Sequence, residues 1–182
     1  MDIEKFVFAG DSAGGHLTMS VTNLCLLRGF RPPDGLIPIY PVLSMDLATF
    51  FPSTLMMADD ELISTGFVTF ACACVIRKGG DPATNPLMSP YVSPDALIKL
   101  LPPTQFYVCE IDGLRDQTYG MAIKMLRQGC QVHIHHMAEY VHGFCNMDNS
   151  GVGVTEFSNA TEEIINTARE LLGMDDNANH ER

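Results

Sequence analysis

Three residue types along the chain could together carry out nucleophilic catalysis: a serine, an acid and a histidine. Ser12 lies between glycines directly after a short apolar run, and Asp112 and His142 each follow a later apolar run. A histidine that takes the proton of a serine hydroxyl, and is itself oriented by a carboxylate, makes that hydroxyl a nucleophile for acyl transfer. The sequence therefore predicts Ser12 as nucleophile, His142 as base and Asp112 as the orienting acid.

These side chains can meet only if the segments that precede them belong to one sheet. Alternating strands and helices predict the α/β class, with a parallel sheet and covering helices. The carboxyl ends of parallel strands lie at one edge of such a sheet, where ligands bind. The apolar spacing of Leu17, Val21 and Leu24 predicts one face of the first helix, which Gly29 ends. We expect strands at 6–9, 36–40, 104–109 and 131–137, and later helices at about 62–77, 117–127 and 157–172.

The serine lies in G-x-S-x-G at a strand-to-helix turn, with Gly10 and Gly14 on either side. This is the pattern of the nucleophile elbow, a sharp turn that exposes the hydroxyl. The alternative, a turn serine with glycine neighbours, is disfavoured because an acid and a histidine also follow later strands. A similar glycine-rich string occurs in chymotrypsin-like proteases, but those are all-β and place the serine last.

Other polar residues compete for parts of this site. Asp116 is a second candidate for the acid, although its position just before an expected helix favours an N-cap. Glu139 stays open as a third candidate because it is near His142 in sequence. A metal site at His133, His135 and His136 is disfavoured, since no nearby carboxylate or cysteine completes a ligand set. We expect no metal and no organic cofactor.

Composition restricts the partners. The chain has 182 residues, of which 46% are hydrophobic and 18% charged, as in one globular domain. The formal net charge of −11 disfavours nucleic acid as a partner. No apolar stretch reaches the roughly 20 residues that a transmembrane helix needs, and no secretion signal opens the chain. These observations predict a cytoplasmic protein in which the six cysteines are reduced.

Five segments occur in a recognisable order along nearly the whole chain: GDSAGG, YPVLS, NPLMSP, LPPTQFYVCEIDGLRD and VHGF. In this order they resemble the hormone-sensitive lipase family of α/β-hydrolases. The resemblance implies an esterase or lipase that acts on a small-molecule ester or acylglycerol, with Ser12, Asp112 and His142 as the triad. The backbone N–H of Ala13 is then expected to donate to the oxyanion. Gly113 stands where the family usually has proline.

The stretch at about 42–101 resembles part of the family's helical cap, inserted between strands. A substrate pocket is one interpretation of its apolar residues, and ordinary core packing is the other. Two residues adjacent to the expected triad, Asp11 and Val141, are further candidates. The substrate-binding candidates in the insertion are Met56, Met57, Phe67 and Phe70.

The resemblance also implies an upstream HGGG loop that supplies oxyanion donors, and this chain does not contain it. The first strand, FVFA, is apolar on both faces, which is typical of an interior strand. We therefore expect residues 1–182 to form a single α/β-hydrolase domain truncated at the N-terminus, with a loose tail at 173–182. Self-association through the exposed first strand is expected. An inactive fragment and a non-catalytic small-molecule-binding relative remain the alternatives.

Overall fold

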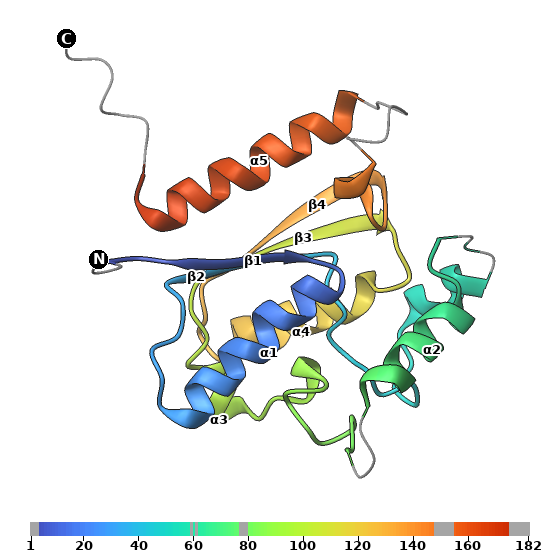
Figure 1. Cartoon of the computed structure of the whole chain (residues 1–182), viewed down its shortest axis with the longest axis horizontal. Helices are drawn as coiled ribbons and strands as arrows, with labels where there is room; N and C mark the ends of the chain where they lie inside the picture. The colour runs from blue at the N-terminus through green and yellow to red at the C-terminus, as the bar shows by residue number, and fades with distance from the viewer. Residues whose placement is uncertain (1–3, 59, 61, 77–79, 148–154, 175–182) are drawn as a thin grey trace.

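The described residues form a parallel sheet of four strands in the order β1-β2-β3-β4. A computed structural model describes residues 4–58, 60, 62–76, 80–147 and 155–174 (Figure 1). The prediction of a parallel α/β fold is confirmed, and each expected strand is present. The strands are β1 (Val7–Asp11), β2 (Gly35–Ile39), β3 (Thr104–Ile111) and β4 (Val132–Val141).

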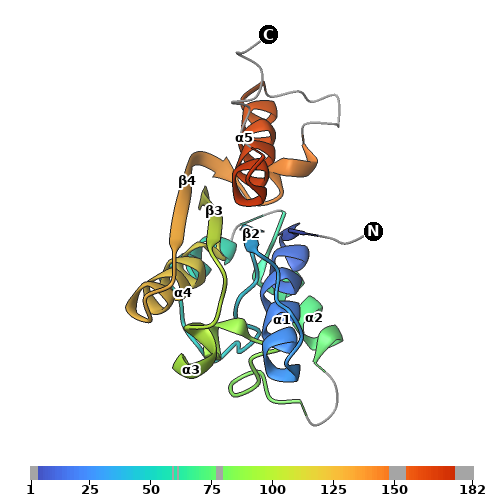
Figure 2. The ribbon, with the colours of Figure 1, turned by 90° about the vertical axis from the view of Figure 1, so that its left-hand side faces the viewer.

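Helices cover both faces of this sheet. In Figures 1 and 2, α1 (Ala13–Arg28) and α4 (Arg115–Arg127) lie on one face, and α5 (Thr155–Leu172) lies on the other. The short α3 (Asp95–Ile98) lies on the same side as α1. Within the described part of the chain, no helix is long and apolar enough to cross a membrane.

The core has two parts, one on each face of the sheet. Because side chains alternate along a strand, Leu36 and Phe106 pack under α1 and α4, whereas Ile37 and Tyr107 pack under α5. All four side chains are fully buried. The central strands β2 and β3 therefore hold the two layers together and keep their carboxyl ends in place.

The expected apolar face of α1 is not the buried face. Leu17 is 57% exposed and Val21 is 38% exposed, whereas the polar residues His16 and Asn23 are buried. The polar face of α1 packs on the irregular segment after β2, whose backbone carbonyls need hydrogen-bond donors. His16 bonds to the carbonyl of Val42, and the Asn23 amide donates to the carbonyl of Pro86. Tertiary hydrogen bonding therefore overrides the apolar periodicity.

The insertion at about 42–101 contains short helices joined by turns. Its longest helix, α2 (Thr65–Val75), is shorter than expected and lies apart from the sheet in Figure 1. The described part of the chain also has three 3-10 turns: η1 (Pro52–Ala58), η2 (Pro90–Val92) and η3 (Phe144–Asn146). Most of the tail expected at 173–182 lies outside the described residues.

Candidate active site

Ser12 occupies the turn between β1 and α1. Its backbone has φ 51° and ψ −114°, a combination that costs a residue with a Cβ about 1–3 kcal/mol. The surrounding structure holds this conformation, since the N–H of Ser12 donates to the carbonyl of Ile39 at 2.9 Å. The carbonyl of Ser12 accepts from the N–H of His16 at 3.0 Å, which starts the helix. The turn exposes the hydroxyl at the carboxyl end of the sheet.

Two glycines make this turn sterically possible. A Cβ on Gly10 would lie 2.6 Å from the carbonyl carbon of Gly14, so the strand and the helix could not approach each other. A Cβ on Gly15 would lie 2.9 Å from the Cβ of Pro41. At Gly14, the second glycine of the motif, the nearest atom to a Cβ would be 3.8 Å away. The close packing of the strand against the helix therefore depends on the missing side chains of Gly10 and Gly15. Gly14 takes part through its backbone atoms, which pack against Gly10.

The three predicted catalytic side chains lie in one hydrogen-bonded chain. His142 Nε2 is 2.9 Å from Ser12 Oγ, and His142 Nδ1 is 2.9 Å from Asp112 Oδ2. A carboxylate only accepts, so Nδ1–H donates to Asp112 and leaves Nε2 to accept from the serine hydroxyl. Asp112 is 1% exposed and His142 is 7% exposed. The structure brings together the ends of β1, β3 and β4 in the arrangement that acyl transfer needs.

Neighbouring residues also hold Asp112 and His142 in place. The second oxygen of Asp112 accepts from the N–H of Leu114 at 2.8 Å, which fixes the carboxylate plane. The ring of Tyr40 lies 4.7 Å from the ring of His142. Burial raises the pKa of Tyr40, so its hydroxyl stays protonated and donates to Asp11 at 3.2 Å. Asp11 also accepts from Asn146 at 3.3 Å, and so ties the segment after His142 to the elbow.

Asp116 is not an N-cap, because α4 begins at Arg115 and Leu114 precedes it. The N-cap interpretation is wrong. The helix starts earlier than expected, and Asp116 instead accepts from the N–H of Ser53 at 2.8 Å and from Arg115 Nε at 2.9 Å. The bond to Ser53 joins η1 to α4. Glu139, the third candidate for the acid, is exposed, and its N–H donates to Glu110.

The histidines of β4 take part in packing and hydrogen bonds. His135 stacks on Tyr107 with ring centroids 4.2 Å apart, and its Nδ1 is 2.7 Å from Glu163. Burial is the main cause that lowers the pKa of His135. His136 bonds to the hydroxyl of Tyr119 at 2.7 Å. Among the described residues, no group of three His, Cys, Asp or Glu side chains could hold a metal ion.

An apolar cavity of about 430 Å³ opens beside Ser12, between α1 and α2. Its size is within the range of small-molecule sites, about 300–1,000 Å³. Phe67, one of the predicted pocket residues, is in the lining. The lining comprises Ser12, Ala13, His16, Leu17, Ser20, Val42, Met45, Ile63, Phe67, Val68, Ala71, Cys72, Val75, Leu87, Leu114 and His142.

Sequence reasoning missed the contribution of α1 to this cavity. Ser12, His16 and Ser20 are spaced by four residues, so they share one helix face, and this spacing could have revealed them. Burial lowers the pKa of His16. Its Nδ1–H donates to Val42 at 3.0 Å and its Nε2 accepts from Ser20 at 3.0 Å, so both nitrogens are satisfied when the ring is neutral.

The other predicted pocket residues are not in this lining. Met57 is 4% exposed and fills the space beside Gly113, where a Cβ would lie 2.1 Å from Met57 Cγ. Met57 thus occupies the space that a larger side chain at position 113 would need, so glycine fits at this position, where proline is usual in the family. Phe70 is 68% exposed on α2. Met56, Asp11 and Val141 also lie outside the lining.

Ala13 is the first residue of α1, so its N–H is among the helix N-terminal donors that have no partner within the helix. The positive end of the helix dipole lies at the same position. Ala13 also lines the cavity beside Ser12. An anionic oxygen that forms at this position would therefore meet a backbone donor and a favourable dipole.

Comparisons with known proteins agree with this architecture. A sequence profile of the α/β-hydrolase fold matches residues 1–146. Hormone-sensitive lipase of Mus musculus is 33% identical over 82 residues, which are 45% of this chain and 10% of that protein. Lipase 2 of Moraxella sp. (strain TA144) is 27% identical over 189 residues, covering 89% of this chain and 42% of that protein.

Solved structures show the same fold. Carboxyl esterase 2 of Tuber melanosporum has a TM-score of 0.76 and 23% identity, covering 94% of this chain and 55% of that chain. Brefeldin A esterase, a bacterial homologue of human hormone-sensitive lipase, has a TM-score of 0.73 and 25% identity. The match covers 92% of this chain and 46% of that chain. The chain thus spans about half the length of these solved relatives. By its profile match and its similarity to hormone-sensitive lipases, the chain belongs to the α/β-hydrolase fold family, which confirms the resemblance that its motifs indicated.

Proposed function

We propose that this chain carries the catalytic triad of a serine carboxylic-ester hydrolase of the esterase/lipase type. The observation that carries the proposal is the hydrogen-bonded chain from Ser12 through His142 to Asp112, with both contacts at 2.9 Å. The family supports ester hydrolysis as the class of reaction.

In the proposed mechanism, Ser12 Oγ attacks the acyl carbon while His142 Nε2 takes the hydroxyl proton. The carbon–oxygen bond to the alcohol then breaks, and His142 returns the proton to the leaving alcohol. Water attacks the acyl-enzyme with His142 again as base, which releases the acid and restores Ser12. Asp112 stabilises the imidazolium in both steps. The Ala13 N–H is the proposed donor to the oxyanion, and such donors are worth about 10²- to 10³-fold in turnover.

The cavity beside Ser12 is the proposed site for the acyl chain of the substrate. Its lining is mainly apolar, and it reaches the nucleophile at one end. Each methylene removed from water contributes about 0.8 kcal/mol, or roughly a fourfold preference. We therefore propose esters with an aliphatic acyl chain as the substrate class, with longer chains preferred until the cavity is full.

A covalent probe tests the proposed nucleophile directly. A fluorophosphonate should phosphonylate Ser12, and peptide mass spectrometry should locate the added group there. A denatured sample treated in the same way is the control, because labelling must require the assembled site. Labelling at another serine, or equal labelling after denaturation, would contradict the proposal.

The acyl-chain assignment predicts a shift in chain-length preference. Ala71 lines the cavity, so Ala71→Phe should lower the ratio of kcat/KM for hexanoyl over acetyl p-nitrophenyl esters by about tenfold, equivalent to the loss of roughly two buried methylenes. Ala73→Phe is the matched control on the same helix, because Ala73 is exposed and lies outside the lining. An equal shift in both variants, or none in Ala71→Phe, would show that the acyl chain binds elsewhere.

Two expectations stay predictions: a cytoplasmic location, and self-association through the first strand.

A further inference from the structure

The apolar cavity beside Ser12 has polar side chains that the proposed mechanism does not use. Four of its lining residues carry a side-chain oxygen or nitrogen: Ser12, His16, Ser20 and His142. Ser12 and His142 belong to the triad, whereas His16 and Ser20 have no part in acyl transfer. Each of these two is 6% exposed. Burial of a polar group is unfavourable unless the group is hydrogen-bonded, so the bonds of this pair determine what the cavity can bind.

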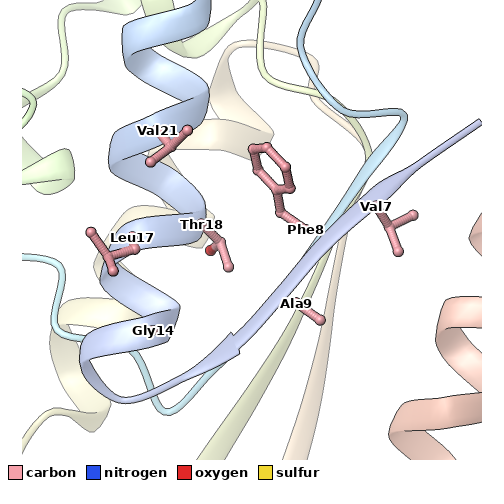
Figure 3. Close-up of a pocket in the computed structure, with 7 residues that line it drawn as sticks. All are labelled: Val7, Phe8, Ala9, Gly14, Leu17, Thr18 and Val21. Carbon is pink, nitrogen blue, oxygen red and sulfur yellow. The ribbon is translucent and has the colours of Figure 1, made fainter.

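The helix geometry places Ser20 on the cavity side of α1. In Figure 3, Thr18 projects from α1 toward β1. Each residue turns an α-helix by about 100°, so Ser20, two positions later, points away from β1 and into the cavity that α2 covers. Ser20 follows Ser12 by eight residues, which is about 12 Å along the helix axis. The two hydroxyls therefore lie in the same cavity but well apart.

His16 determines where the proton of the Ser20 hydroxyl lies. A carbonyl only accepts, so the Nδ1–H of His16 donates to the carbonyl of Val42 at 3.0 Å. Burial of the ring is the main cause that lowers the pKa of His16, so at neutral pH its Nε2 carries no proton. Ser20 Oγ lies 3.0 Å from this Nε2 and therefore donates its hydroxyl proton to it.

The oxygen of Ser20 is consequently left as an acceptor. A hydroxyl oxygen has two lone pairs, and among the described residues the partner of this hydroxyl is His16. A plain hydrocarbon chain in the cavity would bury this oxygen without a donor, which is unfavourable, whereas a chain with a donor at the same depth would not. The lining includes no acidic side chain, so a charged donor such as an ammonium group would be left unpaired. A neutral hydroxyl fits these conditions.

We propose that the cavity selects acyl chains with a terminal hydroxyl group, which donates to Ser20 Oγ two helical turns from the nucleophile. The inference rests on the proposed function, because the acyl chain must lie in this cavity. Carbon–carbon bonds of an extended chain advance roughly 1.25 Å each, so a distance of about 12 Å places the hydroxyl near the tenth carbon. Esters of ω-hydroxy fatty acids of this length are the substrate class.

Binding of ester analogues tests the hydroxyl separately from catalysis. Methyl nonyl ketone and its ω-hydroxy derivative carry a ketone in place of the ester carbonyl and differ by the terminal hydroxyl. Ser20→Thr keeps the acceptor oxygen, whereas Ser20→Val replaces it by a methyl group of the same shape. The ratio of the dissociation constant of the plain ketone to that of the ω-hydroxy ketone should be about tenfold higher in Ser20→Thr than in Ser20→Val, as for one hydrogen bond. Isothermal titration calorimetry measures both constants.

An ω-methoxy ketone is the ligand control, because an ether oxygen accepts but does not donate. Wild type should bind the ω-hydroxy ketone about tenfold more tightly than the ω-methoxy ketone, a comparison that needs no variant. Val68→Ala removes an apolar contact elsewhere in the lining, so it should weaken the binding of plain and ω-hydroxy ketones by the same factor. Circular dichroism shows that each variant is folded.

Turnover should carry the same signature. The ratio of kcat/KM for p-nitrophenyl ω-hydroxydecanoate over p-nitrophenyl decanoate should also fall by about tenfold from Ser20→Thr to Ser20→Val. Equal ratios in the two variants, or equal affinity of wild type for the ω-hydroxy and ω-methoxy ketones, would overturn the hydroxyl selection. Ser12-dependent turnover of plain esters would then still support the proposed function. If neither ketone binds and no Ser12-dependent turnover is measured, both proposals are wrong.

Discussion

Replacing Ser12 by alanine should lower ester turnover by about 10⁴- to 10⁶-fold, the largest effect of any single substitution in this chain. The proposed mechanism has no other nucleophile, because His142 Nε2 makes its 2.9 Å contact with Ser12 Oγ. Turnover of p-nitrophenyl butyrate by purified wild type and Ser12→Ala, at equal folded concentration, measures the effect. Activity of the variant within tenfold of wild type would remove Ser12 from the mechanism.

Ser12→Gly separates the loss of the nucleophile from the strain at the turn. The positive φ of 51° disfavours any residue with a Cβ, so glycine relieves strain of about 1–3 kcal/mol. Glycine also costs about 0.5–1 kcal/mol in chain entropy, so we expect a net stabilisation of about 1 kcal/mol. Ser12→Ala keeps the Cβ and should not show this gain. Urea unfolding of both variants, each inactive, makes the comparison.

Asp112→Asn should lower kcat by about 10⁴-fold while the fold is retained. The amide oxygen of asparagine can still accept from the N–H of Leu114, as Asp112 does at 2.8 Å. The amide nitrogen then faces His142 Nδ1 as a donor, so the proton of the neutral imidazole moves to Nε2. In that tautomer His142 cannot accept the proton of Ser12. The loss therefore appears in kcat and not in the free energy of unfolding.

Asp116→Asn is the matched control, with the same change of charge in the neighbouring first turn of α4. Asp116 bonds to Ser53 and Arg115, away from the imidazole. We expect turnover within about threefold of wild type and a loss of about 1 kcal/mol in unfolding free energy, as for one weakened hydrogen bond. If Asp116→Asn lost activity and Asp112→Asn kept it, our assignment of the acid would be wrong.

Patterns within the sequence were sufficient to predict the strands and the three polar residues that follow them. The apolar runs of β1 to β4 are short and bounded by glycine or proline, and the alternation with helices requires parallel pairing. Parallel strands necessarily bring their carboxyl ends to one edge. Because Ser12, Asp112 and His142 each follow such a strand, the sequence predicted that they lie at that edge, while Asp116 and Glu139 stayed open as alternatives for the acid.

The tertiary structure decided which face of each helix is buried and which acid meets the imidazole. α1 buries His16 and Asn23 because the carbonyls of the insertion need donors, a demand that periodicity within the helix cannot reveal. Asp112 and Asp116 are four residues apart, and the start of α4 at Arg115 directs only Asp112 to His142. The sequence by itself determined where the strands lie along the chain and which polar residues follow them, because both depend on local pattern. The cavity and the contact of Met57 with Gly113 depend on contacts between distant segments, which only the folded chain defines.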